Sequence, residues 1–248
     1  MFHLLSRTRT AYALPHGERV YAVGDIHGRL DLLDALLAKI EIDVLARHSA
    51  FITLLFLGDL IDRGPDSASV VRRAMVKPVW ADNVIVLKGN HEDAMLEGLA
   101  GDLTMAEVWL RVGGDMALIS WGFSPTVLRD SSIDEIINAA KAIIPRVERA
   151  WLSDRPTSYQ LGQFLFVHAG IRPGIPLKLQ NKKDFLWIRD DFLKSRADHG
   201  VMVVHGHTIS EQVEFRSNRI GVDTGAYLTG QLTALCLEGL DRWLIKTI

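Results

Sequence analysis

In the first hundred residues, continuous apolar runs of strand length alternate with segments whose apolar residues recur at helical spacing. Leucine and isoleucine fall on one face of residues 31–40, which predicts an amphipathic helix. A second helix is expected over 66–76, with Pro65 at its start. The expected strands are 19–23, 51–57 and 84–87. This order predicts an α/β fold in which ligands gather beyond the carboxyl ends of the strands.

The middle of the chain has a different pattern. Residues 92–154 lack strand signals and carry an apolar stripe at helical spacing, which Pro145 is expected to kink or break. We interpret this region as a helical insertion or lid within a single domain that spans 1–248. Further strands are expected at 164–167, 201–204, 212–215, 219–222, 232–237 and 243–245. Short turns between several of them predict antiparallel hairpins, and residues 1–17 are expected to be a loose lead-in.

Composition narrows the functional class. The 248-residue chain is 48% hydrophobic and 23% charged, as in ordinary soluble proteins, and its net charge of −2 gives no reason to expect nucleic acid or membrane partners. No apolar run reaches the roughly 18–20 residues that span a bilayer. The N-terminal residues lack a signal-peptide pattern, and the single cysteine, Cys236, is expected to be a buried thiol. We therefore expect a cytoplasmic location.

Polar motifs follow the predicted strands. Their side chains are Asp25 and His27 after the first strand, Asp59 after the second, Asn90 after the third, and His168 and His207 after two later strands. Carboxylate, imidazole and carboxamide groups at strand ends are typical of a two-metal hydrolytic site. Six ligands suffice for two divalent ions if one carboxylate is shared. We expect Asp59 to be shared, because its strand lies between the other two in sequence.

Other residues of the same motifs suit phosphate chemistry. Arg63 follows Asp59 by four residues and could direct its guanidinium to phosphate oxygens. His91 could protonate a leaving alkoxide, and Asp62 could hold that imidazole oriented and protonated. Alternatively, Asp62 pairs with Arg63 or caps the following helix.

Two further assignments depend on position. His205 precedes the motif Gly206-His207-Thr208, and strand alternation would direct it to the opposite face from its immediate neighbour. We therefore interpret His205 as a core or supporting residue and His207 as the ligand. Trp109, Trp121 and Trp151 are interpreted as core or lid packing, because no basic patch accompanies them for stacking on nucleic acid bases.

With these motifs in place, the chain resembles the PPP family of metallophosphoesterases, which contains the serine/threonine protein phosphatases. The signature Gly-Asp-x-His-Gly, Gly-Asp-x-x-Asp-Arg-Gly and Gly-Asn-His-Glu is complete at 24–28, 58–64 and 89–92. Val-His-Ala-Gly and Gly-His-Thr match the later motifs, through His168 and His207. The resemblance covers about residues 19–230, is best with compact bacterial and phage members, and extends to symmetrical diadenosine tetraphosphate hydrolases.

The resemblance implies a calcineurin-like fold, with two mixed β-sheets in a sandwich flanked by helices. It implies one metal held by Asp25, His27 and Asp59, and a second held by Asp59, Asn90, His168 and His207. It also implies His91 as general acid with Asp62 behind it, and a phosphate site formed by Arg63, Arg189, Asn90 and His91. Arg189 is assigned by the family alone, because spacing does not separate it from Arg172 or Arg196. Manganese is the expected metal, with iron and zinc as alternatives.

The expected activity is phosphomonoester hydrolysis on phosphorylated proteins, peptides or small phosphoesters, by in-line attack of a metal-bridging hydroxide. The target could be phosphoserine, phosphothreonine or phosphotyrosine. The alternative is symmetrical dinucleoside tetraphosphate hydrolysis, but in those relatives a small apolar residue typically stands at the position of Asp62. A metal-holding binding protein without catalysis is disfavoured, since no ligand or acid is missing. No obligate regulatory subunit is expected, and residues 92–154 and the loops near 180–191 would set specificity.

Overall fold

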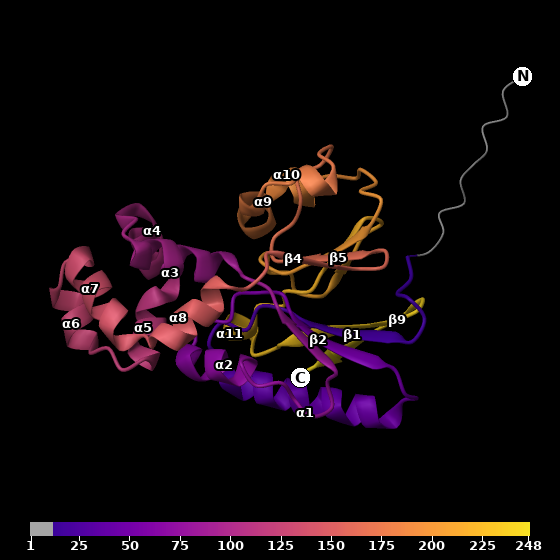
Figure 1. Ribbon diagram of the computed structural model, residues 1–248, viewed down its shortest axis with the longest axis horizontal. Coiled ribbons are helices and arrows are strands. Elements are labelled where there is room, and N and C mark those ends of the chain that lie inside the picture. Colours follow the sequence, from indigo (N-terminus) through magenta and orange to yellow (C-terminus); the bar gives the residue numbers. More distant parts are fainter. Residues whose placement is uncertain (1–11) are drawn as a thin grey trace, which may run out of the picture.

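The computed structural model describes residues 12–248 and contains two five-stranded β-sheets packed as a sandwich with helices around it (Figure 1). The predicted fold class, an α/β metallophosphoesterase sandwich of two mixed sheets, is confirmed. The lead-in expected at residues 1–17 lies largely outside the described residues. Within 12–248, no helix is both long enough and apolar enough to cross a membrane.

The first sheet contains the strands predicted from the N-terminal alternation. In sheet order it consists of β10 (Asp241–Lys246), β9 (Thr233–Glu238), β1 (Glu18–Val23), β2 (Phe51–Phe56) and β3 (Asn83–Val86). The strands β1, β2 and β3 are parallel, and β9 is antiparallel to both β1 and β10. Parallel strands need crossover connections, which here contain α1 (Leu30–Ala46) and α2 (Ser67–Ala74). Their carboxyl ends therefore meet at one edge of the sheet.

The second sheet is mixed. In sheet order it consists of β4 (Ser158–Leu161), β5 (Phe164–Val167), β6 (Met202–His205), β8 (Arg219–Gly221) and β7 (Glu214–Phe215). The expected antiparallel hairpins occur at β7–β8 and β9–β10, and β4, a strand that was not predicted, forms a third hairpin with β5, whereas β5, β6 and β8 run parallel. Sequence spacing did not predict that parallel core, because strand neighbours in a sheet depend on long-range packing.

A helical insertion separates β3 from β4. It contains α3 (Asn90–Ala100), α4 (Leu103–Trp109), the turn η1 (Leu110–Gly114), α5 (Asp115–Ser120), α6 (Pro125–Asp130), α7 (Ile133–Ile143) and α8 (Arg146–Ser153). These helices lie together at one end of the sandwich (Figure 1). The predicted break at Pro145 is present, since this residue stands between α7 and α8.

Short helical segments were not predicted. They are η2 (Leu177–Leu179), α9 (Lys182–Trp187), α10 (Asp190–Leu193) and α11 (Ala226–Thr229). The region 180–191, expected to be loops, therefore contains α9 and the start of α10. These helices span too few residues to show helical periodicity. Phe185 of α9 and Phe192 of α10 pack in one cluster with Leu165, Val167 and Val203 of the second sheet.

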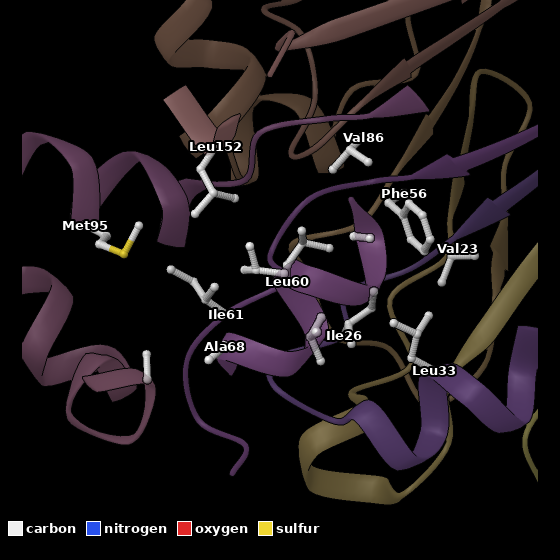
Figure 2. Close-up of a cluster of buried hydrophobic side chains, with 14 of the residues drawn as sticks. Val23, Ile26, Leu33, Phe56, Leu60, Ile61, Ala68, Val86, Met95 and Leu152 are labelled. Atoms are coloured by element: carbon white, nitrogen blue, oxygen red, sulfur yellow. The ribbon is translucent and has the colours of Figure 1, made fainter. Parts of the chain in front are cut away.

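One hydrophobic cluster joins the first sheet to the insertion. Figure 2 shows its side chains from strands (Val23, Phe56), from the loops that follow them (Ile26, Leu60) and from the insertion (Met95, Leu152). A second cluster, which includes Ala22, Leu55, Phe166, Val204 and Ile220, fills the space between the two sheets. Because the first core is shared, we propose that the insertion belongs to the same domain as the sandwich and is held rigidly beside its strand ends.

Candidate active site

The six predicted metal ligands converge where strands of both sheets end. Asp25, His27, Asp59 and Asn90 follow β1, β2 and β3, while His168 and His207 follow β5 and β6. All six side chains are buried, none with more than 7% of its surface exposed. Buried polar groups must find partners, so these side chains can be accommodated only by bonding one another, the backbone or a bound ion.

The backbone around these residues adopts conformations that only a well-packed site would impose. Five non-glycine residues of the described chain have positive φ, and all lie in the motifs: His27 (48°), Asp59 (50°), Asp62 (74°), Arg63 (66°) and His207 (64°). Such residues cost free energy and cluster at functional sites. A glycine is required at position 64, because a Cβ there would lie 2.2 Å from the carbonyl oxygen of His27.

Within residues 12–248, potential ligand atoms form two clusters, and Asp59 belongs to both. One contains His27, Asp59 and His91, and the other contains Asp59, His168 and His207. In the first, Asp59 Oδ2 lies 3.6 Å from His27 Nε2 and 3.8 Å from His91 Nε2. Asp59 is thus the carboxylate that the two clusters share.

In the second cluster, imidazole nitrogens lie close to carboxylate and amide oxygens. His168 Nε2 lies 2.9 Å from Asn90 Oδ1 and 3.4 Å from Asp59 Oδ2, and His207 Nδ1 lies 2.7 Å from the same amide oxygen. His168 Nδ1 can donate to the Leu57 carbonyl at 2.9 Å, which leaves the Nε2 lone pair directed at these acceptors. A metal ion or a proton on Nε2 can satisfy these acceptors, and carboxylate, amide and imidazole ligands fit manganese, iron or zinc.

The protonation tendencies indicate that the Asp59 side of this cluster attracts positive charge, whether a proton or a metal ion. Burial lowers the pKa of His168, but the carboxylates of Asp59 and Asp25 outweigh it and raise the value to about 10. Burial, together with the positive charge of His168, lowers the pKa of His207 to about 2. Burial also holds the pKa of His27 well below its usual range. Its Nδ1 can donate to the carbonyl of Ile61 at 2.8 Å, so a neutral Nε2 faces the site.

Asp25 differs from the other predicted ligands. It lies outside both clusters, and its two carboxylate oxygens accept from the backbone N–H of His207 at 2.9 and 3.2 Å. A Cβ at position 206 would lie 2.0 Å from Asp25 Oδ1, so only glycine fits there. Burial and the neighbouring Asp223 raise the pKa of Asp25 well above its usual range. This carboxylate thus connects the first-sheet and second-sheet parts of the site.

Asp62 pairs with His91. His91 Nδ1 donates to Asp62 Oδ2 at 2.6 Å, and Asp62 is fully buried. Of the alternatives left open by the sequence, the helix cap is excluded, because Asp66 is the N-cap of α2. Burial lowers the pKa of His91, but Asp59 and Asp62 overcome this and raise it above its ordinary value. This geometry orients the imidazole and favours its protonated form beside the Asp59 carboxylate.

The two predicted phosphate-binding arginines occupy different environments. The Arg63 guanidinium donates to His27 Nε2 at 3.0 Å, and its other terminal nitrogen lies 3.1 Å from His91 Nε2, to which it can donate only while that imidazole is neutral. Arg189 is exposed just before α10, and its charge contributes to the lowered pKa of His207. By contrast, Arg172 is held in ion pairs with the acidic residues of α9 and α10. Of these latter two arginines, Arg189 is therefore the one whose charge acts on the cluster.

His205 lies in the core rather than with the candidate ligands. Its Nδ1 donates to the Gly206 carbonyl at 3.0 Å, and its ring packs edge-on against Phe192 with centroids 5.2 Å apart. Burial lowers its pKa to about 4. His205 and His207 are separated because β6 ends at His205 and the backbone then turns, with φ of 64° at His207.

Sequence reasoning missed three supporting residues. Glu92, quoted in the motif but given no role, accepts backbone N–H groups from both metal-site loops. Asp223 is buried beside Asp25 and directly follows a predicted strand, a signal that could have identified it. The ring of Tyr227 lies 4.6 Å from the Arg63 guanidinium and 5.3 Å from the His27 ring, a contact that no local sequence pattern indicates.

Comparisons with known proteins give the family. The family model described as calcineurin-like phosphoesterase matches residues 18–232. Serine/threonine-protein phosphatase 2 of Escherichia coli K12 is 28% identical across 88% of this chain and 92% of its own length. The asymmetrical bis(5'-nucleosyl)-tetraphosphatase PrpE of Anoxybacillus flavithermus is 28% identical across 86% and 88%. The symmetrical bis(5'-nucleosyl)-tetraphosphatase of Chromobacterium violaceum is 29% identical across 62% and 44%. The resemblance inferred from the motifs is confirmed.

Proposed function

The chain belongs to the calcineurin-like phosphoesterase family, and we propose that it is a dinuclear metal-dependent phosphomonoesterase whose substrates are phosphorylated proteins or peptides. The observation that carries this proposal is the 2.6 Å hydrogen bond between His91 and the buried Asp62, beside the two clusters of ligand atoms.

The proposed ligands are those implied by the motifs. Asp25, His27 and Asp59 would hold one ion, and Asp59, Asn90, His168 and His207 would hold the other. Once bound, two such ions, manganese by preference, lower the pKa of water at the site and neutralise phosphate charge. The hydrogen bond from Arg63 to His27 Nε2 at 3.0 Å occupies the lone pair that this ligand set needs. Metal binding would therefore release that part of the Arg63 guanidinium toward substrate.

Protein side chains would perform the remaining steps. Arg63 and Arg189 would hold the phosphate oxygens, together with the Asn90 amide and the His91 imidazole, and place the phosphorus opposite its leaving group. His91 would transfer its Nε2 proton to the leaving oxygen. Asp62, bonded to Nδ1, fixes the ring and stabilises its charged form.

Leaving-group chemistry favours a phosphomonoester. A serine or threonine alkoxide is a strong base that leaves readily only when an acid protonates it, whereas a nucleoside phosphate leaves as a stable anion. Asp59 and the buried Asp62 favour the protonated form of His91, which benefits the first reaction far more than the second. Symmetrical dinucleoside tetraphosphate hydrolysis is the second candidate, supported by the 29% identity to the symmetrical tetraphosphatase across 62% of the chain.

The test is turnover of the manganese-loaded protein on phosphoserine, phosphothreonine and phosphotyrosine peptides and on diadenosine tetraphosphate, at equal concentrations. Higher kcat/KM on a phosphopeptide supports the proposal, and the ranking of the three peptides gives the side-chain class. Higher kcat/KM on the dinucleotide overturns the proposal in favour of the second candidate. Absence of turnover on every substrate, with metal bound, would indicate a binding protein.

Further proposals concern the partners and the location of the protein. The net charge of −2 supports a protein that acts without nucleic acid or membrane partners. The single buried thiol, Cys236, needs no disulfide partner and supports a cytoplasmic location. We also propose that no regulatory subunit is needed, which activity of the isolated chain on phosphopeptides would establish.

A further inference from the structure

The helical insertion reaches into the site through one side chain. Trp109, the last residue of α4, is fully buried, and its Nε1 donates to Asp62 Oδ1 at 2.9 Å. The other oxygen of that carboxylate accepts from His91 Nδ1. The Asp62 carboxylate is thus held from both sides, by the indole on one oxygen and by the imidazole on the other.

The turn that follows Trp109 is shaped for this contact. A Cβ at position 114 would lie 2.6 Å from Trp109 Nε1, so only glycine leaves room for the indole. One residue earlier, Gly113 has φ of 112° and its carbonyl accepts from the backbone N–H of Arg63 at 3.2 Å. The segment 109–114 therefore contacts both Asp62 and Arg63, although it lies about 50 residues further along the chain.

We propose that Trp109 is a positioning residue for leaving-group protonation, acting through Asp62 on His91. The inference rests on the proposed phosphomonoesterase function. A carboxylate that accepts one hydrogen bond can turn about its Cβ–Cγ bond, whereas one held at both oxygens presents a fixed lone pair to the imidazole. Without the indole N–H, Oδ1 loses this donor in a place with no exposed surface, and the His91 ring loses its fixed orientation.

The critical variant is Trp109→Phe, which keeps an aromatic ring in the core and removes the N–H. The chain offers a matched control in Trp121→Phe. Trp121 is also buried in the insertion and donates its Nε1 to a carboxylate, that of Glu148, at 2.6 Å. Both variants lose an indole–carboxylate hydrogen bond, but only the carboxylate that Trp109 binds, Asp62, is hydrogen-bonded to His91.

The kinetic readout is the dependence on the leaving group. We expect Trp109→Phe to lower kcat on a phosphoserine peptide by about tenfold, a fraction of the roughly 10²–10⁴-fold that general acids contribute. On p-nitrophenyl phosphate, whose phenolate leaves without a proton, kcat should change by less than about twofold, with KM unchanged on both substrates. Trp121→Phe should lower neither value. Adding Trp109→Phe to Asp62→Asn should cause no further loss, because both act through one hydrogen-bonded unit.

A second measurement does not depend on turnover. In the zinc-loaded protein, which is diamagnetic, the His91 Nδ1–H proton should give a downfield NMR resonance that is absent in His91→Asn. We expect Trp109→Phe to shift this resonance and Trp121→Phe to leave it in place. If Trp109→Phe does not fold, a tryptophan analogue with sulfur in place of the ring N–H, inserted at position 109, removes the same donor with nearly the same shape.

The inference is overturned if the Trp109 variant loses kcat equally on both substrates, or keeps wild-type kcat and an unshifted resonance. Equal losses would mean that the indole only supports the core. Failure of the proposed function is distinguishable, because it would appear in the wild-type protein as preference for the dinucleotide. In that case the NMR comparison of the two tryptophan variants still decides whether the indole orients His91.

Discussion

The side chain of Glu92 is expected to hold the metal-site loops in place, and its replacement by glutamine isolates that role. The carboxylate is almost completely buried at the start of α3. Its Oε1 accepts from the backbone N–H groups of Leu60 and Ile61 at 2.8 and 3.3 Å. Its Oε2 accepts from those of Asp59 and Gly89 at 3.0 and 2.8 Å. One carboxylate thus joins the loop after β2 to the loop after β3.

The magnitude follows from these contacts. Whichever way the glutamine amide turns, its NH₂ replaces one oxygen and faces two backbone N–H groups that then have no acceptor. Each buried donor left unpaired costs about 1–3 kcal/mol, so Glu92→Gln should lower the free energy of unfolding by about 2–6 kcal/mol. For a chain of this length each kcal/mol lowers the melting temperature by about 2–4 °C, which makes the loss readily measurable.

The assay is thermal and urea unfolding of the metal-free protein, since bound metal would add its own stabilisation. Glu97→Gln is the matched control, because Glu97 is exposed on the same helix and its replacement should change the free energy by no more than about 0.5 kcal/mol. Manganese affinity should also fall in Glu92→Gln, since Asp59 would lose its fixed position. A Glu92→Gln protein as stable as the Glu97 control would refute the reasoning.

Three further outcomes are expected. His91→Asn should lower kcat on phosphoserine peptides by about 10²–10⁴-fold while calorimetry shows unchanged manganese binding; wild-type turnover would contradict its role as acid. Asp62→Asn should move the alkaline decline of kcat to lower pH, because Asp62 helps to raise the pKa of His91 and the acid acts only below that pKa; an unmoved pH profile would argue against the pair. His207→Gln should lose one of two bound manganese ions by metal analysis, whereas His205→Gln should keep both; equal stoichiometry in the two variants would reverse their assignments.

Local sequence patterns predicted an α/β fold and brought the candidate ligands into one group, whereas the two-sheet sandwich was implied by the family resemblance. Apolar runs of strand length followed by short polar motifs identified β1, β2 and β3, and Asp25, Asp59 and Asn90 do lie beyond their carboxyl ends. This succeeded because strand length and burial are encoded within a few neighbouring residues. The break at Pro145 was predictable for the same reason, since the ring of proline acts on its own helix.

Pairings between distant residues were decided only by the tertiary structure. The sequence left three roles open for Asp62: partner of His91, partner of Arg63, or helix cap. The fold brings it to His91, 29 residues away, and to Trp109, 47 residues away. Arg189 could not be separated from Arg172 until α9 and α10 were seen to hold Arg172 in ion pairs.

The sequence by itself therefore determined which chemical groups this protein has and which strand ends carry them, since both are local properties. The tertiary structure decided which oxygen faces which nitrogen, because that depends on how two sheets and a helical insertion pack. Trp109 shows the difference most clearly. Its burial was expected from its apolar ring, but its hydrogen bond to Asp62 exists only because Gly114 leaves the indole room to approach the site.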